Sequence, residues 1–123
     1  MTAEKRRDAQ RIDDMLNAIR EIEEEVGSLG RAEYEKDRTV QKAVTFDIMV
    51  LGDAASRVSQ RTKKANPAVP WAELARYRNA EETGPAHGYF GFDLAGTWTF
   101  VRETVPDLGR KLRRVRVAPE DQE

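Results

Sequence analysis

The chain has 123 residues, with 21 Lys and Arg against 22 Asp and Glu, no cysteine and a single histidine. One domain of average size is expected for this length. The absence of cysteine excludes disulfides, thiolate nucleophiles, iron–sulfur clusters and cysteine-rich zinc sites, and a lone histidine cannot form a His-pair metal motif. Acid–base chemistry near neutral pH therefore has to use His87 or a carboxylate whose pKa is shifted by burial.

Charge and hydropathy narrow the class of protein further. Charged residues make up 35% of the chain, but the two signs nearly cancel, so any nucleic-acid binding has to be local. No apolar run reaches the length of a transmembrane helix, and the charged start MTAEKRRDAQ is not followed by an apolar segment. We therefore expect a cytoplasmic protein without a membrane partner.

Two long helices are predicted in the first half of the chain. Apolar residues spaced three and four apart predict a helix over about residues 3–26, ended by Gly27 and Gly30; they are Ile12, Met15, Leu16, Ile19, Ile22 and Val26. A second helix should start near Asp37 or Thr39, and its apolar stripe comprises Val40, Val44, Asp47 or Ile48, Leu51, Ala55 and Val58. The polar run 60–66 and the turn 67–70 are expected to close it.

The second half predicts two more helices. Trp71 opens a short helix that continues toward Arg78, and Gly84 with Pro85 predicts a loop over residues 80–88. The final helix, capped by Asp93, carries Leu94, Trp98, Val101, Val105, Leu108 and Leu112, and Pro106 predicts a kink or a break near residue 105. The expected fold class is all-α: an antiparallel bundle of four or five helices, forming one domain over residues 1–117 with a disordered tail at 118–123.

Residues that could carry chemistry gather in the segment RYRNAEETGPAHGYFGFD. It contains Arg76, Arg78, Asn79, His87 and Tyr89, in a part of the chain that is rich in aromatic residues. An arginine can hold phosphate oxygens by paired hydrogen bonds, and a neutral imidazole can accept a proton from a ribose 2′-hydroxyl. Arg78 and His87 are therefore a minimal metal-free set for cutting RNA, with Asn79 orienting the imidazole or binding a phosphate oxygen.

The same residues also fit a purely structural interpretation. His87 would then be a loop histidine beside core aromatics, and Tyr89 a packed aromatic. Arg78 would pair with a carboxylate such as Glu73 or Glu81. A further interpretation is a helical interaction protein whose aromatic cluster forms a dimer core, and spacing alone leaves these interpretations open.

Two longer segments carry a resemblance to a known family. They are QKAVTFDIMVLGDAASRVS, with a Gly-acidic-Ala centre, and PAVPWAELARYRNA…HGYFGFDLAGTW, with Pro-Trp, Arg-Asn and His-x-Tyr features. Both are similar to the HepT-like toxins of the HEPN superfamily, and the resemblance covers roughly residues 8–115.

The resemblance implies a HEPN-like, homodimeric bundle that acts as a metal-independent ribonuclease without a cofactor. Arg78 and His87 would be catalytic, with Asn79 as the polar residue after the arginine. The protein would be the toxin of a toxin–antitoxin system, with an RNA such as mRNA or tRNA as substrate. Tyr89 would be adenylylated by a nucleotidyltransferase antitoxin of the MNT type. The alternative is a non-catalytic HEPN-type binding module that pairs with such a nucleotidyltransferase.

The spacing of the two catalytic candidates departs from the family. Its members place four to six residues between arginine and histidine, whereas eight lie between Arg78 and His87. An added helical turn would separate the two side chains by about 6 Å along the axis. Gly84 and Pro85 indicate instead a loop that lets His87 return toward Arg78. If the loop does not bring His87 back toward Arg78, the non-catalytic alternative applies.

Two charged regions are further candidates for binding. The first predicted helix starts with basic residues and ends with acidic ones, which is the reverse of what the helix dipole favours. This pattern fits either a solvated face or a surface that binds a partner. The residues are Lys5, Arg6, Arg7, Glu23, Glu24 and Glu25. A basic run near the last helix end follows that preference and could be structural. Alternatively it binds RNA phosphates together with Arg76; its members are Arg110, Lys111, Arg113, Arg114 and Arg116.

Overall fold

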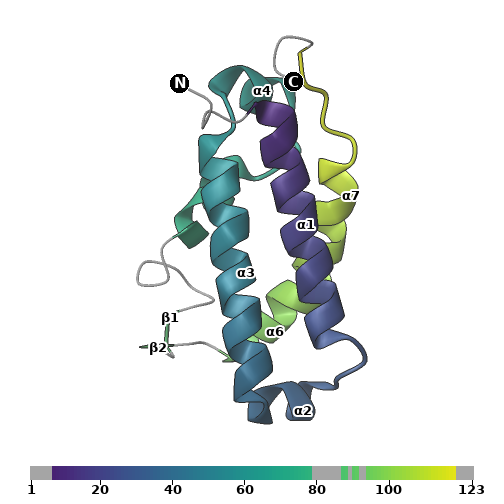
Figure 1. The fold of residues 1–123 in the computed structure, drawn as a ribbon, viewed down its shortest axis with the longest axis vertical. Coiled ribbons are helices and arrows are strands. Elements are labelled where there is room, and N and C mark those ends of the chain that lie inside the picture. Colours follow the sequence, from purple (N-terminus) through teal and green to yellow (C-terminus); the bar gives the residue numbers. More distant parts are fainter. Residues whose placement is uncertain (1–6, 79–86, 89, 92–93, 119–123) are drawn as a thin grey trace.

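The computed structural model describes residues 7–78, 87–88, 90–91 and 94–118 (Figure 1). In chain order, the helical elements are α1 (Asp8–Val26), α2 (Arg31–Lys36), α3 (Arg38–Arg57), α4 (Gln60–Ala65), α5 (Trp71–Ala75), the 3₁₀ turn η1 (Arg76–Arg78), α6 (Leu94–Thr99), the π-helical segment η2 (Phe100–Thr104) and α7 (Val105–Leu112). Two short strands, β1 (His87–Gly88) and β2 (Phe90–Gly91), pair with each other in parallel. The predicted all-α bundle is confirmed.

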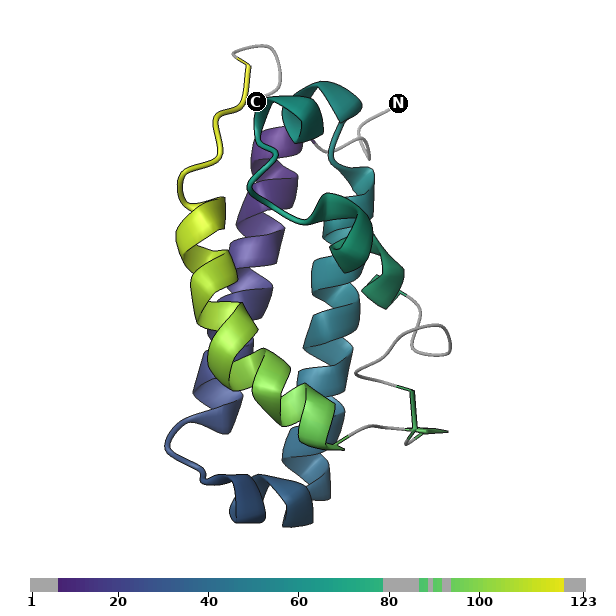
Figure 2. The same cartoon turned by 180° about the vertical axis from the view of Figure 1, so that it is seen from behind.

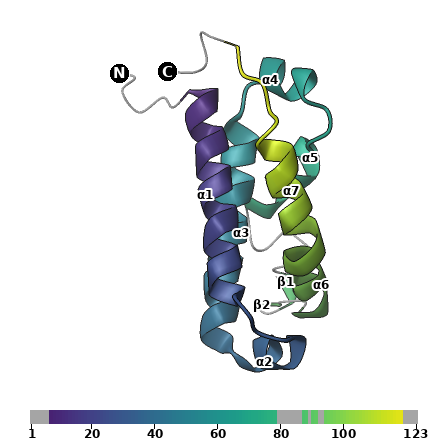
Figure 3. The ribbon, with the colours of Figure 1, turned by 90° about the vertical axis from the view of Figure 1, so that its right-hand side faces the viewer.

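Three long helical segments form the bundle. α1 and α3 lie side by side and antiparallel, and the continuous run from α6 through η2 to α7 packs behind them (Figures 1 and 2). Seen from the side, α1 and α3 form one layer, and α5, α6 and α7 form the second (Figure 3). α2 lies at one end of the bundle and α4 at the other. None of the described helices is long and apolar enough to cross a membrane.

The ends of the two long N-terminal helices follow from local capping. α1 begins at Asp8 and not near residue 3, because Arg7 is extended and its N–H donates to Gln10 Oε1 at 2.8 Å. The predicted end at Gly27 is confirmed, since this residue has a φ of +52°. Asp37 is confirmed as the cap of α3, where its Oδ1 accepts from the Val40 N–H at 3.1 Å.

The polar run expected to close the second helix instead forms a helix of its own, α4. Its cap is Ser59, whose Oγ accepts from the Thr62 N–H at 3.3 Å. The buried carboxylate of Asp8 accepts from the Ser59 N–H at 3.0 Å, and from the hydroxyls of Ser59 and Thr62 at 2.5 Å each. Burial raises the pKa of Asp8, but these hydrogen bonds outweigh it and hold the pKa below its usual value. The start of α1 is thereby tied to the α3–α4 junction.

The break expected near residue 105 takes the form of a π-helical turn. Pro106 has no N–H, so the regular helical ladder cannot pass through it unchanged. The Val105 N–H instead bonds to the Phe100 carbonyl five residues earlier, and α7 begins with Pro106 in its first turn. The helix is distorted at the predicted position, but it continues from α6 into α7 without a break and restart.

The predicted apolar stripes form the core between the two layers. The most deeply buried side chains include Met15, Ile22, Val44, Leu51, Leu74, Val105, Leu108 and Leu112. After α7, the chain is held against the connection between α4 and α5, because Asn66 Nδ2 donates to the Arg116 carbonyl and Arg116 N–H donates to Asn66 Oδ1, both at 3.0 Å. Most of the predicted tail, residues 119–123, lies outside the described residues.

Gly52 brings α3 and the α5–η1 segment unusually close together. A Cβ atom on Gly52 would lie 2.5 Å from the Arg78 nitrogen, 2.6 Å from the Leu74 carbonyl oxygen and 2.7 Å from the Tyr77 carbonyl carbon. These are backbone atoms, which cannot swing away as the end of a long side chain can. Only glycine lets the two segments pack at this distance.

We therefore expect Gly52→Ala to lower the free energy of unfolding by at least roughly 1–3 kcal/mol, through overpacking against the backbone. Gly109→Ala in α7 is the matched control. Its Cβ would meet the flexible end of Arg113 at 3.4 Å and Ile19 Cγ2 at 3.7 Å, so the gain in helix propensity should leave stability unchanged or higher. Urea unfolding measures both variants, and wild-type stability of Gly52→Ala would contradict the packing argument.

Candidate active site

Arg78 lies at the end of a short segment that is held at three points. Trp71, at the start of α5, is buried and its indole Nε1–H donates to the Asn66 carbonyl at 2.9 Å. Leu74 is fully buried one turn later. The backbone of Arg78 itself rests on Gly52 of α3. The position of this arginine is therefore set by the core and not by a loose loop.

The guanidinium of Arg78 is exposed to solvent. Its Nη1 donates to the Ala75 carbonyl at 2.8 Å, and no carboxylate among the described residues pairs with it. The pairing with Glu73 that the structural interpretation expected is wrong, because the Glu73 carboxylate accepts from the Tyr77 hydroxyl at 3.5 Å instead. Burial, followed by the charge of Glu73, raises the pKa of Tyr77. Glu81 lies outside the described residues. Arg78 thus keeps donors for an external anion.

His87 lies in β1, where its backbone is extended and pairs with Phe90. An extended histidine does not continue the helix that carries Arg78. η1 packs on α3, and β1 lies on the same side of α3 in the view of Figure 1. η1 and β1 therefore lie on one side of the molecule in this view. Asn79, Tyr89 and the segment 79–86 between the two elements lie outside the described residues.

The aromatic rings of the described residues pack inside one chain. Tyr77 and Phe100 meet edge to face with centroids 5.3 Å apart, which ties η1 to η2. The rings of Tyr34 and Trp98 lie 5.4 Å apart, and the Arg102 guanidinium lies 4.7 Å above Trp98. These ring contacts join elements within one chain. Phe46 differs from them, since its side chain is 63% exposed on α3.

The basic candidates divide into two groups on different helices. Arg76 is exposed in η1, which packs on α3, whereas the run 110–116 belongs to α7 and the segment after it, and α7 packs on α1. Arg110 and Lys111 pair with Asp107 at 3.4 and 3.0 Å, and the hydrogen bond from Lys111 lowers the Asp107 pKa. Arg113, Arg114 and Arg116 are exposed, and no described carboxylate pairs with them.

The end of α4 brings further cations to the basic run, which the sequence alone did not reveal. Lys63 and Lys64 line a groove beside Pro67 and Val69. Lys111 and Arg114 line another groove, of about 360 Å³, beside the same two residues. These cations are far apart in the sequence. The hydrogen bonds between Asn66 and Arg116 hold the two segments that carry them together.

The reversed charges of α1 have a structural compensation. Glu23 and Glu24 are exposed, and the carbonyl end of α1 receives its positive charge from another helix. Arg102 Nη2 donates to the carbonyls of Gly27 and Leu29 at 3.2 and 2.6 Å. Lys5 and Arg6 lie outside the described residues.

The chain is similar in sequence to known ribonucleases. A family model described as HepT-like, Ribonuclease HepT-like, matches residues 15–115. The chain is 30% identical over 105 residues to "Probable ribonuclease HepT" of Thermococcus cleftensis, covering 85% of this chain and 92% of the relative. It is 26% identical over 102 residues to "Putative RNase MJ1380" of Methanocaldococcus jannaschii, covering 83% and 90%. No solved structure matches the chain. The chain belongs to the ribonuclease HepT-like family.

Proposed function

We propose that this protein is a metal-independent endoribonuclease in which Arg78 and His87 act on the same phosphate. The observation that carries the proposal is the exposed guanidinium of Arg78, fixed on α3 and free of a carboxylate partner among the described residues, in a chain of the HepT-like family. β1, the strand that contains His87, lies on the same side of the bundle as η1 in Figure 1. It is also the only histidine of the chain.

The reaction needs one base and one anion-binding group. The neutral imidazole of His87 accepts the proton of a ribose 2′-hydroxyl, and the 2′-oxygen attacks the adjacent phosphorus. The bond from phosphorus to the 5′-oxygen breaks, and the imidazolium returns a proton to that leaving oxygen. The products are a 2′,3′-cyclic phosphate and a 5′-hydroxyl. Arg78 stabilises the negative charge that grows on the phosphate oxygens, and Asn79 orients the imidazole or binds one of these oxygens.

The cations around α4 and the end of α7 provide a second contact region for RNA. Lys63, Lys64 and Arg114 are not neutralised by any described carboxylate. Phosphate contacts of this kind position a nucleic acid without reading its sequence. We assign the RNA strand, mRNA or tRNA, to run from this region toward Arg76 and Arg78.

Replacing either catalytic residue should abolish cleavage. Arg78→Ala and His87→Ala are each expected to lower the rate of RNA cleavage by about 100-fold or more, because the charge stabiliser or the base is lost. Arg31→Ala, which removes an exposed arginine of α2 that pairs with Glu35, is the matched control and should cleave like wild type. Cleavage of a labelled RNA in EDTA, with detection of the cyclic phosphate, measures the effect.

Wild-type cleavage by the His87→Ala variant would contradict the assignment of the base. Absence of cleavage by the folded wild-type protein would favour the non-catalytic HEPN-type module. The long separation of eight residues between Arg78 and His87 is the observation that supports this alternative. In that case the protein would bind a nucleotidyltransferase without cutting RNA.

We further propose that the protein is the toxin of a toxin–antitoxin system, acts as a homodimer and is silenced at Tyr89. The His-x-Tyr array formed by His87, Gly88 and Tyr89 supports this, because AMP attached to Tyr89 would stand two residues from the catalytic base. A bulky anionic group at that position blocks the approach of an RNA phosphate by volume and by charge. The partner is a nucleotidyltransferase antitoxin of the MNT type.

Co-expression with a nucleotidyltransferase of this type and ATP should raise the intact mass of the protein by one or more AMP groups and abolish cleavage. Tyr89→Phe should gain no mass. Tyr77→Phe is the control, because it removes a hydroxyl whose hydrogen-bond partner among the described residues is Glu73 and leaves the modified position intact. An unchanged wild-type mass, or an adduct retained by Tyr89→Phe, would contradict the proposal.

A further inference from the structure

A groove of about 360 Å³ lies between the α4–α5 connection and the end of α7. The segment that follows α7 passes beside α4 and contributes to it (Figures 2 and 3). Most of its lining is apolar and comprises Ala65, Pro67, Ala68, Val69 and Val115. Grooves of a few hundred cubic ångströms with apolar walls are the usual form of a small-molecule site. This first groove therefore has room for a group of the size of a nucleobase.

Hydrogen bonds hold both walls of the first groove in place. Asn66 Nδ2 donates to the Thr62 carbonyl at 2.8 Å and to the Arg116 carbonyl at 3.0 Å, and the Arg116 N–H donates back to Asn66 Oδ1. The Asn66 carbonyl accepts from the Trp71 indole at 2.9 Å. A ligand that enters the groove meets walls that are already ordered, which lowers the entropic cost of binding.

The charged side chains at the first groove are cationic. Lys111 and Arg114 line it beside Asn66, whose amide is already engaged. Lys111 shares Asp107 with Arg110, whereas no carboxylate of the described residues pairs with Arg114. None of the described residues that line this groove is acidic. The groove therefore fits a ligand that joins an apolar group to an anion.

A second groove, of about 530 Å³, shares Pro67 and Val69 with the first. Lys63 and Lys64 line it, and no described carboxylate pairs with either of them. Positive charge therefore continues from the first groove into the second. A polymer that carries one anion in each unit can occupy both grooves.

The second groove also leads toward the catalytic candidates. It reaches Glu73 of α5, and α5 continues through η1 to Arg78. At rises of about 1.5 Å for an α-helical and 2.0 Å for a 3₁₀ residue, Trp71 and Arg78 lie about 12 Å apart along this segment. A base in the first groove therefore belongs to a nucleotide outside the scissile linkage. Glu73 is the one acid among the described residues that line the two grooves, so phosphates favour the end that carries the lysines.

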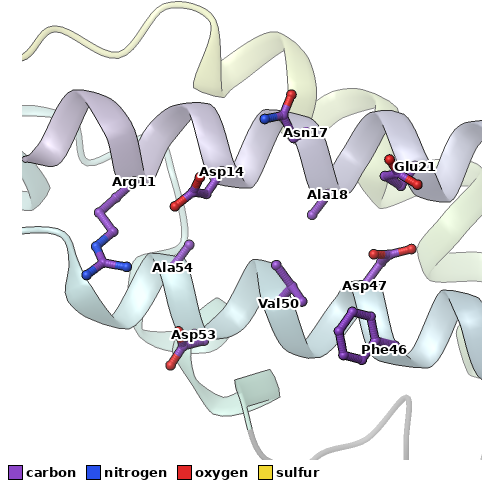
Figure 4. A pocket seen from close by; sticks show the side chains of 10 residues that line it. All are labelled: Arg11, Asp14, Asn17, Ala18, Glu21, Phe46, Asp47, Val50, Asp53 and Ala54. Atoms are coloured by element: carbon purple, nitrogen blue, oxygen red, sulfur yellow. The ribbon is translucent and has the colours of Figure 1, made fainter. Parts of the chain in front are cut away.

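The groove between α1 and α3 has the opposite charge (Figure 4). Of the described residues that line it, Arg11 is the cation and four are acidic, namely Asp14, Glu21, Asp47 and Asp53. Asp47 also lies beside Glu25, and burial followed by this neighbour raises the pKa of Glu25 to about 8. Phosphates would be repelled there. Of these three grooves, the two beside Pro67 and Val69 therefore suit a nucleic acid.

We propose that the first groove holds the base of one unpaired nucleotide of an RNA strand, with the adjacent phosphate on Arg114 and the next between Lys63 and Lys64. Because this is a site for RNA, it rests on the proposed ribonuclease function and restricts the substrate to unpaired strands. In a duplex the bases are paired and stacked, whereas those of single strands, loops and bulges can enter a groove. An acidic peptide also carries negative charge, but an RNA strand repeats a ring and an anion in every unit, which matches two successive grooves with apolar walls and cations.

Binding of a short, labelled 2′-O-methyl RNA, measured by fluorescence anisotropy, tests the first groove without cleavage. Because each 2′-oxygen is methylated, this strand cannot be cut by attack of its own 2′-hydroxyl. Arg114→Ala removes the cation, Ala68→Leu fills the groove from an exposed position, and each should raise the dissociation constant by about tenfold. Arg31→Ala and Ala32→Leu make the same changes on exposed residues of α2, at the other end of the bundle, and should bind like wild type.

A scan with one abasic residue at each position of the strand identifies the base that enters the groove. At one position, loss of the base should weaken binding to the wild-type protein by about tenfold. Ala68→Leu should bind that abasic strand as well as it binds the intact strand, because its groove is already filled. At physiological ionic strength, the same strand in a duplex with its complement should bind more weakly than the single strand.

Wild-type affinity of Ala68→Leu, together with equal affinity for every abasic strand, would mean that the cations bind phosphates alone, which overturns the proposal. Equal or tighter binding of the duplex overturns it as well. So does tighter binding of an acidic peptide containing leucine, if Ala68→Leu abolishes it, because the groove would then belong to a protein partner. A wild-type protein that binds the strand through the groove but does not cut unmodified RNA would refute the catalytic proposal and support the groove.

Discussion

The close contact between Gly52 and the backbone of α5–η1 is the constraint on which the position of Arg78 depends. Because residue 52 has no Cβ, the carbonyl of Leu74 and the amide of Arg78 can rest directly on α3. The same contact places Tyr77 against Phe100, so η1 is also fixed to the second layer of the bundle. Arg78 is thus a surface residue on a rigid support, which is what an anion-binding group needs for catalysis.

Several features of the fold were predictable because they depend on short stretches of sequence. The stripes of α1 and α3, the cap at Asp37, the end at Gly27 and the distortion before Pro106 each arise from residues within a few positions of one another. α4 was missed because its polar residues look like a connection. Its stability comes from Asp8, which lies 51 positions before the Ser59 cap and binds it only in the folded chain.

The candidate site shows the same division between local and long-range information. The sequence indicated Arg78 and His87 as partners, and η1 and β1 lie on one side of the bundle in the view of Figure 1. It did not reveal that Gly52 supports Arg78, although the Gly-acidic-Ala centre of the second helix was visible. Asp47 fell within an apolar stripe, which was the available signal of an unusual carboxylate. Its approach to Glu25 follows from how α1 packs on α3 and could not be read from spacing.

In the proposed mechanism, Arg78 and His87 form one phosphate site although eight residues separate them in the chain. A chain with one histidine gives a single imidazole Hε1 resonance by NMR, so His87 can be observed without assignment. Titration with a short oligodeoxynucleotide supplies phosphates without a 2′-hydroxyl that could react. We expect this resonance to shift on titration of the wild-type protein and the shift to be lost in Arg78→Ala. A resonance that does not respond, or that responds equally in both proteins, would contradict a shared site.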